Sequence, residues 1–379
     1  MEDNIRLGRI AGIRVGGSWS LLVIVALLVF GLAGNVFPRE YPGLAAGWYV
    51  AAALAGALLF LSSLLAHELA HALAARRAGV EVHSITFWLF GGVARLTGDA
   101  SRPGASLWIA LVGPLTSLLL AAGFGVLAAG LRAAGAPLVV AGVPGWLAWT
   151  NLGLALFNLL PGAPLDGGRV LRALLWWRHG DQDRAARTAA RAGQVLGYLM
   201  IGFGVAELFA GAGVGGLWLV VLGWFVTGAA RAEEQQATAR QTLAGIRVAD
   251  VMTPDPVAAP ASATVAELLA HLTSSYRFTS MPVLDERGRL AGLVTLRRVR
   301  AVPPEHRATT RLADIACPRD QLLTVAPGEP LADLLGRLSA SEDGRALVLD
   351  GDHLVGIVSP TDVVRALGAA NWRARQAAS

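Results

Sequence analysis

Two histidines and a glutamate stand close together in one stretch, residues 64–72. The alanines and leucines around them favour a helix, which places His67 and His71 one turn apart on the same face, where two imidazoles can bind one ion. Glu68 then lies beside them. Neutral imidazoles that hold Zn²⁺ next to a carboxylate that takes a proton from water are the arrangement found in zinc hydrolases. The stretch therefore predicts a hydrolytic zinc site.

The surroundings of this motif predict that it lies in a membrane. Residues 48–65 are almost purely apolar and long enough to cross a bilayer, so the motif stands toward the end of a predicted span. A metal-binding group at membrane depth is costly and is therefore a functional-site hypothesis. The alternative is that His67 and His71 are polar residues on a buried helix, with the Glu68 side chain reaching out to water.

A third ligand is predicted from residues 158–169, which end another apolar segment. Two prolines and three glycines interrupt the helix there, and irregular backbone at membrane depth is tolerated only where protein buries it or it lines a wet cavity. Asp166 is well placed to complete a site of two histidines and one carboxylate, with water as the fourth ligand. The alternative is an ordinary turn in which Asp166 caps the helix that begins at Gly167.

Together these two segments resemble the site-2 proteases, a family of intramembrane zinc metalloproteases, and in particular the subgroup that carries paired CBS domains. Residues 67–71 match the zinc motif of that family, and residues 158–168 match its Asn…Pro…Leu-Asp-Gly signature. The resemblance covers nearly the whole chain. It implies one Zn²⁺ per chain, with Asp166 as the third ligand, and it implies that Asn158 faces the site and steadies the substrate or the developing oxyanion.

Composition predicts a multi-pass α-helical membrane protein followed by a soluble part. Of the 379 residues, 54% are apolar and only 16% are charged, and the apolar excess lies before residue 231. In the third span the small residues Gly113 and Ser117 would let helices approach closely. Six spans are expected, at about residues 19–36, 48–77, 107–130, 139–160, 195–212 and 216–229.

Between the second and third spans the pattern changes from helix to strand. Residues 80–96 alternate apolar and polar positions around Gly91 and Gly92, which predicts a small β-hairpin near the active site. The resemblance implies a sheet to which an extended substrate adds as a further strand. The alternative is that this segment only covers the metal site.

The distribution of arginine predicts the orientation. The N-terminus, residues 76–102, residues 169–191 and everything after residue 231 would share one side, and they hold nearly all the arginines of the membrane core. The opposite loops contain only Arg39 and Arg132. The positive-inside rule therefore places both termini of this cell-membrane protein in the cytoplasm. The basic residues form no nucleic-acid motif, and Cys317 is the only cysteine, so an intrachain disulfide is excluded.

After residue 230 the composition shifts and a pattern appears twice. Residues 248–252 begin one copy and residues 312–316 begin the other, and each copy continues through a strand, a helix and a pair of strands. The predicted organisation is a membrane core at 1–237, a linker at 238–245, CBS domains at 246–305 and 306–368, and a tail at 369–379.

These repeats resemble CBS domains, which pair and bind adenine nucleotides in an α+β module. In that family the last Asp of a Gly-x-x-Ser/Thr-x-x-Asp run bonds the ribose hydroxyls, and Ser359 and Asp362 fit the run. The first repeat has Thr295, but Arg298 stands where the acid belongs, so this arginine would instead meet a phosphate. The alternative is a module that only dimerises; a homodimer through the CBS domains would hold two membrane cores together.

The sequence therefore predicts an intramembrane zinc endopeptidase that cleaves transmembrane segments of other proteins, with Glu68 as the general base. The resemblance implies a role in regulated intramembrane proteolysis. One alternative is a metal transporter gated by CBS domains, although such a site does not need Glu68 and the spans hold few other ionisable residues besides Glu207. Another is a pseudoprotease that only binds client helices.

Overall fold

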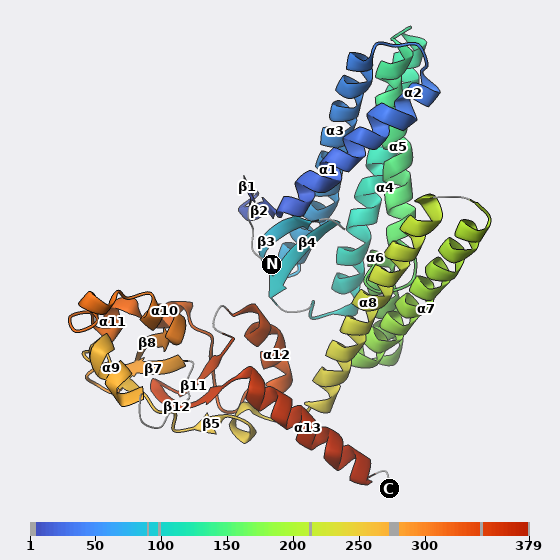
Figure 1. Ribbon diagram of the computed structural model, residues 1–379. Coiled ribbons are helices and arrows are strands. Elements are labelled where there is room, and N and C mark those ends of the chain that lie inside the picture. The colour runs from blue at the N-terminus through green and yellow to red at the C-terminus, as the bar shows by residue number, and fades with distance from the viewer. Residues whose placement is uncertain are drawn as a thin grey trace. The chain divides into compact units, whose positions relative to one another are not determined.

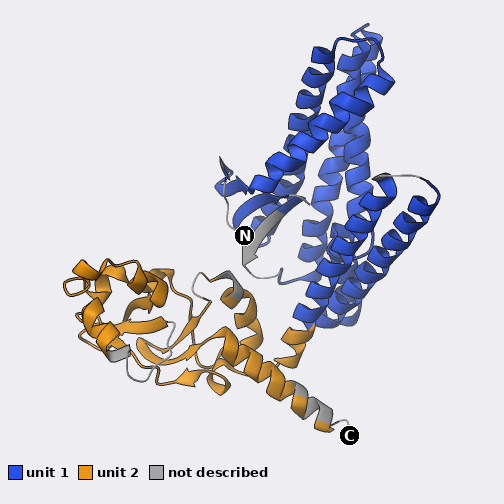
Figure 2. Cartoon of the chain, viewed as in Figure 1, with its two compact units in different colours: residues 1–237 blue, residues 238–379 orange. Residues whose placement is uncertain are grey.

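The computed structural model describes residues 5–88, 91–97, 100–211, 214–272, 280–341 and 344–377. The chain forms two compact units, residues 1–237 and residues 238–379 (Figure 2). In the described part of the chain, the first unit contains long helices and one four-stranded sheet, and the second contains several short helices, one longer C-terminal helix and two four-stranded sheets (Figure 1).

Six helical segments of the described chain are long and apolar enough to cross a membrane, which confirms the predicted multi-pass fold. The first is α1, Trp19–Gly31, which continues through a π-helical turn into α2, Phe37–Glu40. The other five are α3 (Ala46–Arg77), α4 (Pro103–Ala133), α5 (Leu138–Asn158), α7 (Gln182–Phe209) and α8 (Val214–Thr242). The shorter α6, Asp166–His179, lies between α5 and α7.

Two of these helices extend well beyond the predicted membrane spans. The arginine-rich residues after 181 form the first turns of α7, and α8 continues through residue 242, across most of the predicted linker. Both extensions are rich in alanine, glutamine, glutamate and arginine, which are good helix formers, so an apolar helix continues into them without a break.

The helices of the first unit bury small and polar side chains and expose large apolar ones. Ser63, Ser117 and Asn151 are buried, whereas Phe30, Leu119 and Phe209 are more than 70% exposed. This distribution is the reverse of that in a water-soluble helix bundle, and it suits helices whose outer faces contact lipid.

A four-stranded sheet lies beside α3, in the order β1 (Ile5–Ile10), β2 (Ile13–Gly17), β3 (Glu81–Trp88) and β4 (Gly91–Thr97) (Figure 1). Strands β3 and β4 form the predicted hairpin, which is confirmed, but strands in the first seventeen residues were not predicted. Strand β2 pairs with β3 in parallel, and the alternate residues Val15, Ile85 and Phe87 pack one face of the sheet against α3.

Helices α7 and α8 pack closely through glycines that face one another. A β-carbon added at Gly197 would stand 2.8 Å from the carbonyl oxygen of Gly223, and one added at Gly216 would stand 2.6 Å from the carbonyl oxygen of Gly204. Helices approach this closely in membranes where small residues line both surfaces. The contact fixes α8 against the rest of the first unit.

The second unit contains two interlocked repeats. Its sheets have the orders β6-β7-β8-β9 and β10-β11-β12-β5, so each sheet receives its last strand from the start of the other repeat. The first repeat contains β5 (Thr253–Pro254), β6 (Ala259–Pro260), α9 (Val265–Leu272), β7 (Ser280–Leu284), β8 (Leu290–Thr295) and α10 (Leu296–Arg300). The second contains α11 (Leu312–Ile315), β9 (Cys317–Pro318), β10 (Thr324–Val325), α12 (Leu331–Ala340), β11 (Ala346–Asp350), β12 (His353–Val358) and α13 (Pro360–Ala377).

Candidate active site

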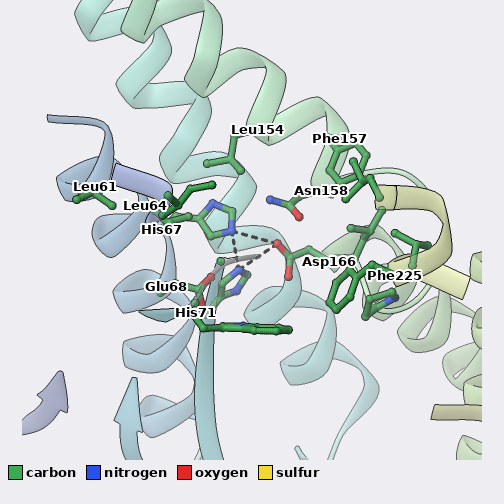
Figure 3. Close-up of a pocket in the computed structure, with 18 of the residues that line it drawn as sticks. Leu61, Leu64, His67, Glu68, His71, Leu154, Phe157, Asn158, Asp166 and Phe225 are labelled. Atoms are coloured by element: carbon green, nitrogen blue, oxygen red, sulfur yellow. Dashed lines mark hydrogen bonds and ion pairs between the residues drawn. The ribbon is translucent and has the colours of Figure 1, made fainter. Parts of the chain in front are cut away.

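His67 and His71 of α3 and Asp166 of α6 meet in the interior of the first unit (Figure 3). The Nε2 atom of each histidine lies 3.2 Å from Oδ2 of Asp166, and the two Nε2 atoms lie 3.2 Å from each other. Both histidines are buried. The three atoms therefore form a nearly equilateral triangle, although Asp166 lies almost a hundred residues from His67 in the sequence.

The size of this triangle fits a metal ion. Ligand atoms at the usual zinc distances in a tetrahedral site stand about 3.3 Å apart, close to the spacing of these three atoms. Two imidazoles and one carboxylate are also a common ligand set of catalytic zinc, which keeps a fourth position for water or substrate. The residues present therefore fit a zinc ion bound by His67, His71 and Asp166.

The other ring nitrogen of each histidine is held by α4. Nδ1 of His71 lies 2.6 Å from the carbonyl oxygen of Ile109, and Nδ1 of His67 lies 2.9 Å from the hydroxyl oxygen of Ser117. Because a carbonyl only accepts hydrogen bonds, Nδ1 of His71 carries the hydrogen, and in a neutral ring Nε2 is left with a free lone pair. That lone pair points toward Asp166 and His67.

Asp166 is positioned by the loop between α5 and α6. Leu165 occupies the N-cap position of α6, and the Asp166 carboxylate faces the imidazoles instead of capping the helix, so the capping alternative does not describe the structure. The loop is fixed to α7, because the amide of Ala163 donates to the carbonyl of Ala189 at 3.1 Å. At Gly193 there is no room for a β-carbon, which would collide with the carbonyl oxygen of Ala163.

A cavity of about 530 Å³ opens onto these side chains. Its apolar walls come from α1, α3 and α8, and include Leu21, Phe60, Leu222 and Phe225. Its polar lining includes His67, His71 and Asp166, together with Glu68, Asn158, Arg169 and Glu233. Figure 3 shows Asn158 beside His67 and Asp166, at the end of α5.

Comparisons with known proteins decide the family. The sequence matches the family model of Peptidase family M50 over residues 55–136 and 136–200, and that of the CBS domain over residues 248–305 and 312–369. It is 50% identical over 366 residues to "Putative zinc metalloprotease Rip3" of Mycobacterium tuberculosis, which covers 96% of this chain and 93% of that protein. The chain belongs to Peptidase family M50, the site-2 proteases.

A second relative agrees with this assignment. "Putative zinc metalloprotease sll0528" of Synechocystis is 30% identical over 373 residues, which is 97% of this chain and 96% of that protein. The chain is also similar to a solved structure, the site-2 protease from Methanocaldococcus jannaschii, with 26% sequence identity and a TM-score of 0.42. The matched region covers 61% of this chain and 94% of that chain. The predicted enzyme class, a zinc metalloendopeptidase of the site-2 protease type with paired CBS domains, is confirmed.

In this site-2 protease the side chain of Glu68 lies against the sheet. A β-carbon added at Gly92 of β4 would stand 2.5 Å from Cγ and 2.8 Å from Cδ of Glu68. The glycine therefore leaves the space that the carboxylate occupies beside the imidazoles.

Replacing Gly92 by alanine should lower peptide cleavage about 100-fold with zinc still bound, because the methyl group pushes Glu68 by roughly an ångström from its place. Gly104→Ala is the matched control, since a β-carbon there meets nothing within 4 Å. Cleavage of a peptide reporter and the zinc content of the purified variants check the prediction. Equal cleavage by both variants would contradict it.

The predicted nucleotide residues of the second unit lie at the ends of β8 and β12. Asp362 is buried, and its Oδ2 accepts hydrogen bonds from the hydroxyl of Ser359 at 2.6 Å and from the Ser359 amide at 2.9 Å. In the first repeat, Oγ1 of Thr295 accepts from the amide of Arg298 at 3.4 Å, and the guanidinium of Arg298 donates to the carbonyl of Ile315. Arg298 thus contacts backbone in the place where the second repeat has a carboxylate.

Three contributors to the site were not identified from sequence. Ser117 and Gly113 were predicted only as small residues that allow close packing, yet one holds His67 and the other gives space to the ring of His71, which a β-carbon at residue 113 would strike. Gly193 stands in an ordinary Ala-Gly-Gln run with no signal of its own. Its importance depends on a loop thirty residues away.

Proposed function

We propose that the chain cleaves a membrane-spanning segment of another protein, inside the bilayer. The observation that carries the proposal is that the three candidate ligands line a largely apolar cavity whose walls come mainly from membrane-spanning helices. An apolar segment can enter such a cavity without losing the environment that it has in lipid.

In the proposed mechanism His67, His71 and Asp166 hold the zinc ion. Bound zinc supplies a Lewis acid that polarises the scissile carbonyl and makes water easier to deprotonate. Glu68 lines the cavity beside the imidazoles, so its carboxylate takes the proton from the attacking water and passes it to the leaving amine. The Asn158 amide, which lies beside His67 and Asp166, donates a hydrogen bond to the carbonyl oxygen as charge develops on it.

The substrate must be unwound before it is cleaved, because a helix holds each carbonyl in a bond to the amide four residues ahead. The sheet order places β4 at one edge of the sheet, and Gly92 of this strand touches Glu68. An extended substrate that pairs with this edge would present its backbone next to the carboxylate.

The proposed orientation places both termini in the cytoplasm, which follows from the arginines. The catalytic histidines stand in the last three turns of α3, before Arg76 and Arg77, and Asp166 comes shortly before Arg169. We therefore propose that the site lies near the cytoplasmic face and that one product leaves on that side.

The experiment compares host cells that lack the gene with cells in which it has been restored. We expect at least one single-span membrane protein to accumulate intact in the deletion strain, and to yield a cytosolic fragment cut within its span after restoration. In parallel, purified protein is placed in liposomes that contain a zinc indicator. Zinc entry without any difference in fragments would replace the protease proposal by the transporter. If neither a fragment nor zinc entry is seen, the alternative of a pseudoprotease that only binds client helices is favoured.

We also propose that an adenine nucleotide binds the CBS pair and alters proteolysis. Ser359 and Asp362 supply the hydroxyl and carboxylate that such a ligand requires, and Asp362 keeps lone pairs for ribose hydroxyls beside its contacts to Ser359 and Arg365. Helix α8 lines the protease cavity with Leu222 and Phe225 and continues to Thr242 in the second unit, so it links the two parts covalently. A second copy of the chain is the proposed partner of this unit, and a strictly monomeric mass in mild detergent would contradict that.

Replacing Asp362 by alanine should weaken adenine-nucleotide binding by at least tenfold, because a ligand that hydrogen-bonds this carboxylate loses two acceptor atoms. Asp352→Ala is the control, since the Asp352 carboxylate forms an exposed ion pair with Arg319. Isothermal titration of the full chain with AMP and ATP makes the measurement. Equal nucleotide affinity of the two variants would show that Asp362 does not bind the nucleotide. If the native chain bound neither AMP nor ATP, the alternative of a module that only dimerises would be favoured.

A further inference from the structure

We infer that Ser117 of α4 is a positioning residue for His67, which fixes the imidazole so that Nε2 faces the metal position. The inference rests on the proposed function insofar as His67 is a zinc ligand. It concerns how strongly the chain binds zinc, and it can be tested without any substrate.

Ser117 behaves differently from the other hydroxyls of the described membrane helices around it. The hydroxyls of Ser63, Thr116 and Thr150 donate to the carbonyl four residues earlier in their own helix, at 2.7 to 2.9 Å. This is the usual choice of a hydroxyl in an apolar helix. Ser117 instead contacts the ring of His67 on α3, with its Oγ 2.9 Å from Nδ1.

The contact is buried on both sides. Ser117 is 0% exposed and His67 is 2% exposed, so water cannot replace the serine as a partner of the ring. When Nε2 binds a metal, Nδ1 carries the hydrogen and needs an acceptor, and the serine oxygen is the acceptor that the structure provides. Without it the ring would have a buried N–H with no partner and would be free to turn.

One face of α4 serves both histidines. Ile109, Gly113 and Ser117 follow one another at intervals of four residues and therefore lie along one side of the helix. The carbonyl of Ile109 accepts from His71, and Gly113 leaves space for the His71 ring. The hydroxyl of Ser117 contacts Nδ1 of His67, and it accepts the hydrogen of that atom when Nε2 binds a metal. Ile109 acts through its backbone and Gly113 through the absence of a side chain, so Ser117 is the member of this set that contributes a side-chain atom.

Ser117→Ala should lower zinc affinity by 10- to 100-fold, the range seen when such supporting groups are removed from metal-binding histidines. Ser117→Thr keeps a hydroxyl and should restore most of the affinity. Thr116→Val is the matched control, because Thr116 neighbours Ser117 on the same helix but its hydroxyl donates to that helix's own backbone, at the carbonyl of Val112. Its zinc affinity should equal that of the native chain.

The measurement uses the full chain, stripped of metal in detergent and titrated with zinc against a chromophoric chelator. The visible spectrum of the cobalt-loaded protein reports the ligand geometry, and it should change in Ser117→Ala and not in Thr116→Val. Thermal unfolding of the metal-free variants shows whether each is folded. Native affinity and spectrum in a folded Ser117→Ala protein would overturn the inference, as would an equal loss in Thr116→Val. Because no readout depends on peptide cleavage, failure of the proposed substrate would leave this result intact.

Discussion

Replacing Glu68 by glutamine is expected to abolish peptide cleavage while the protein keeps its zinc. Glutamine has nearly the shape of glutamate, so the close contact with Gly92 and the triangle formed by His67, His71 and Asp166 should persist. It cannot accept the proton of the attacking water, however, and loss of a general base costs about 100- to 10,000-fold in rate. Binding and chemistry should therefore separate in this variant.

The matched control is Glu207→Gln. Glu207 is another carboxylate in a membrane-spanning helix, but it lies outside the residues that line the cavity. Cleavage of a membrane-protein reporter and the zinc content of both purified variants are the two measurements. If Glu68→Gln retained more than a tenth of the native rate, the carboxylate would not be the base; if it lost zinc, its role would be in binding the metal.

The chemistry of this site could be predicted from sequence because it depends on short patterns. His67, Glu68 and His71 lie within five residues on one helix, and the helical repeat alone places the two imidazoles together. The break in the fourth span predicted Asp166 because irregular backbone at membrane depth needs a reason. The spans and the CBS repeats were predicted on the same basis, from local hydrophobicity and from self-similarity.

What the sequence did not predict depends on contacts between distant segments. Strand β2 is a strand because Val15 lies opposite Ile85, seventy residues later, and the first seventeen residues contain no hairpin signal strong enough to show it. A serine in an apolar helix normally bonds its own backbone, so nothing in the sequence separates Ser117 from Thr116. Positioning groups of this kind are visible only once the helices are packed.

Gly193 gives the second large effect, and it is a residue that no metal ligand touches. Gly193→Ala should lower zinc affinity and cleavage together, by at least about 100-fold, because the added methyl collides with the carbonyl oxygen of Ala163. Backbone on both sides of this contact cannot turn away as a flexible side chain can. The loop of the variant must therefore shift. Asp166 follows Ala163 by three residues, so this shift would move its carboxylate away from the imidazoles.

Gly202→Ala on the same helix is the matched control, and it should leave zinc affinity and cleavage unchanged. A β-carbon at residue 202 meets nothing within 4 Å, and alanine is a better helix former than glycine by about 1 kcal/mol, so this variant should be native or slightly more stable. Chelator competition for zinc, reporter cleavage and thermal unfolding of the two proteins give the comparison. If Gly193→Ala bound zinc as tightly as Gly202→Ala, the contact with α7 would not position Asp166. If zinc affinity and cleavage fell only in Gly193→Ala, helix α7, which supplies none of the three candidate ligands, would be shown to position the Asp166 carboxylate.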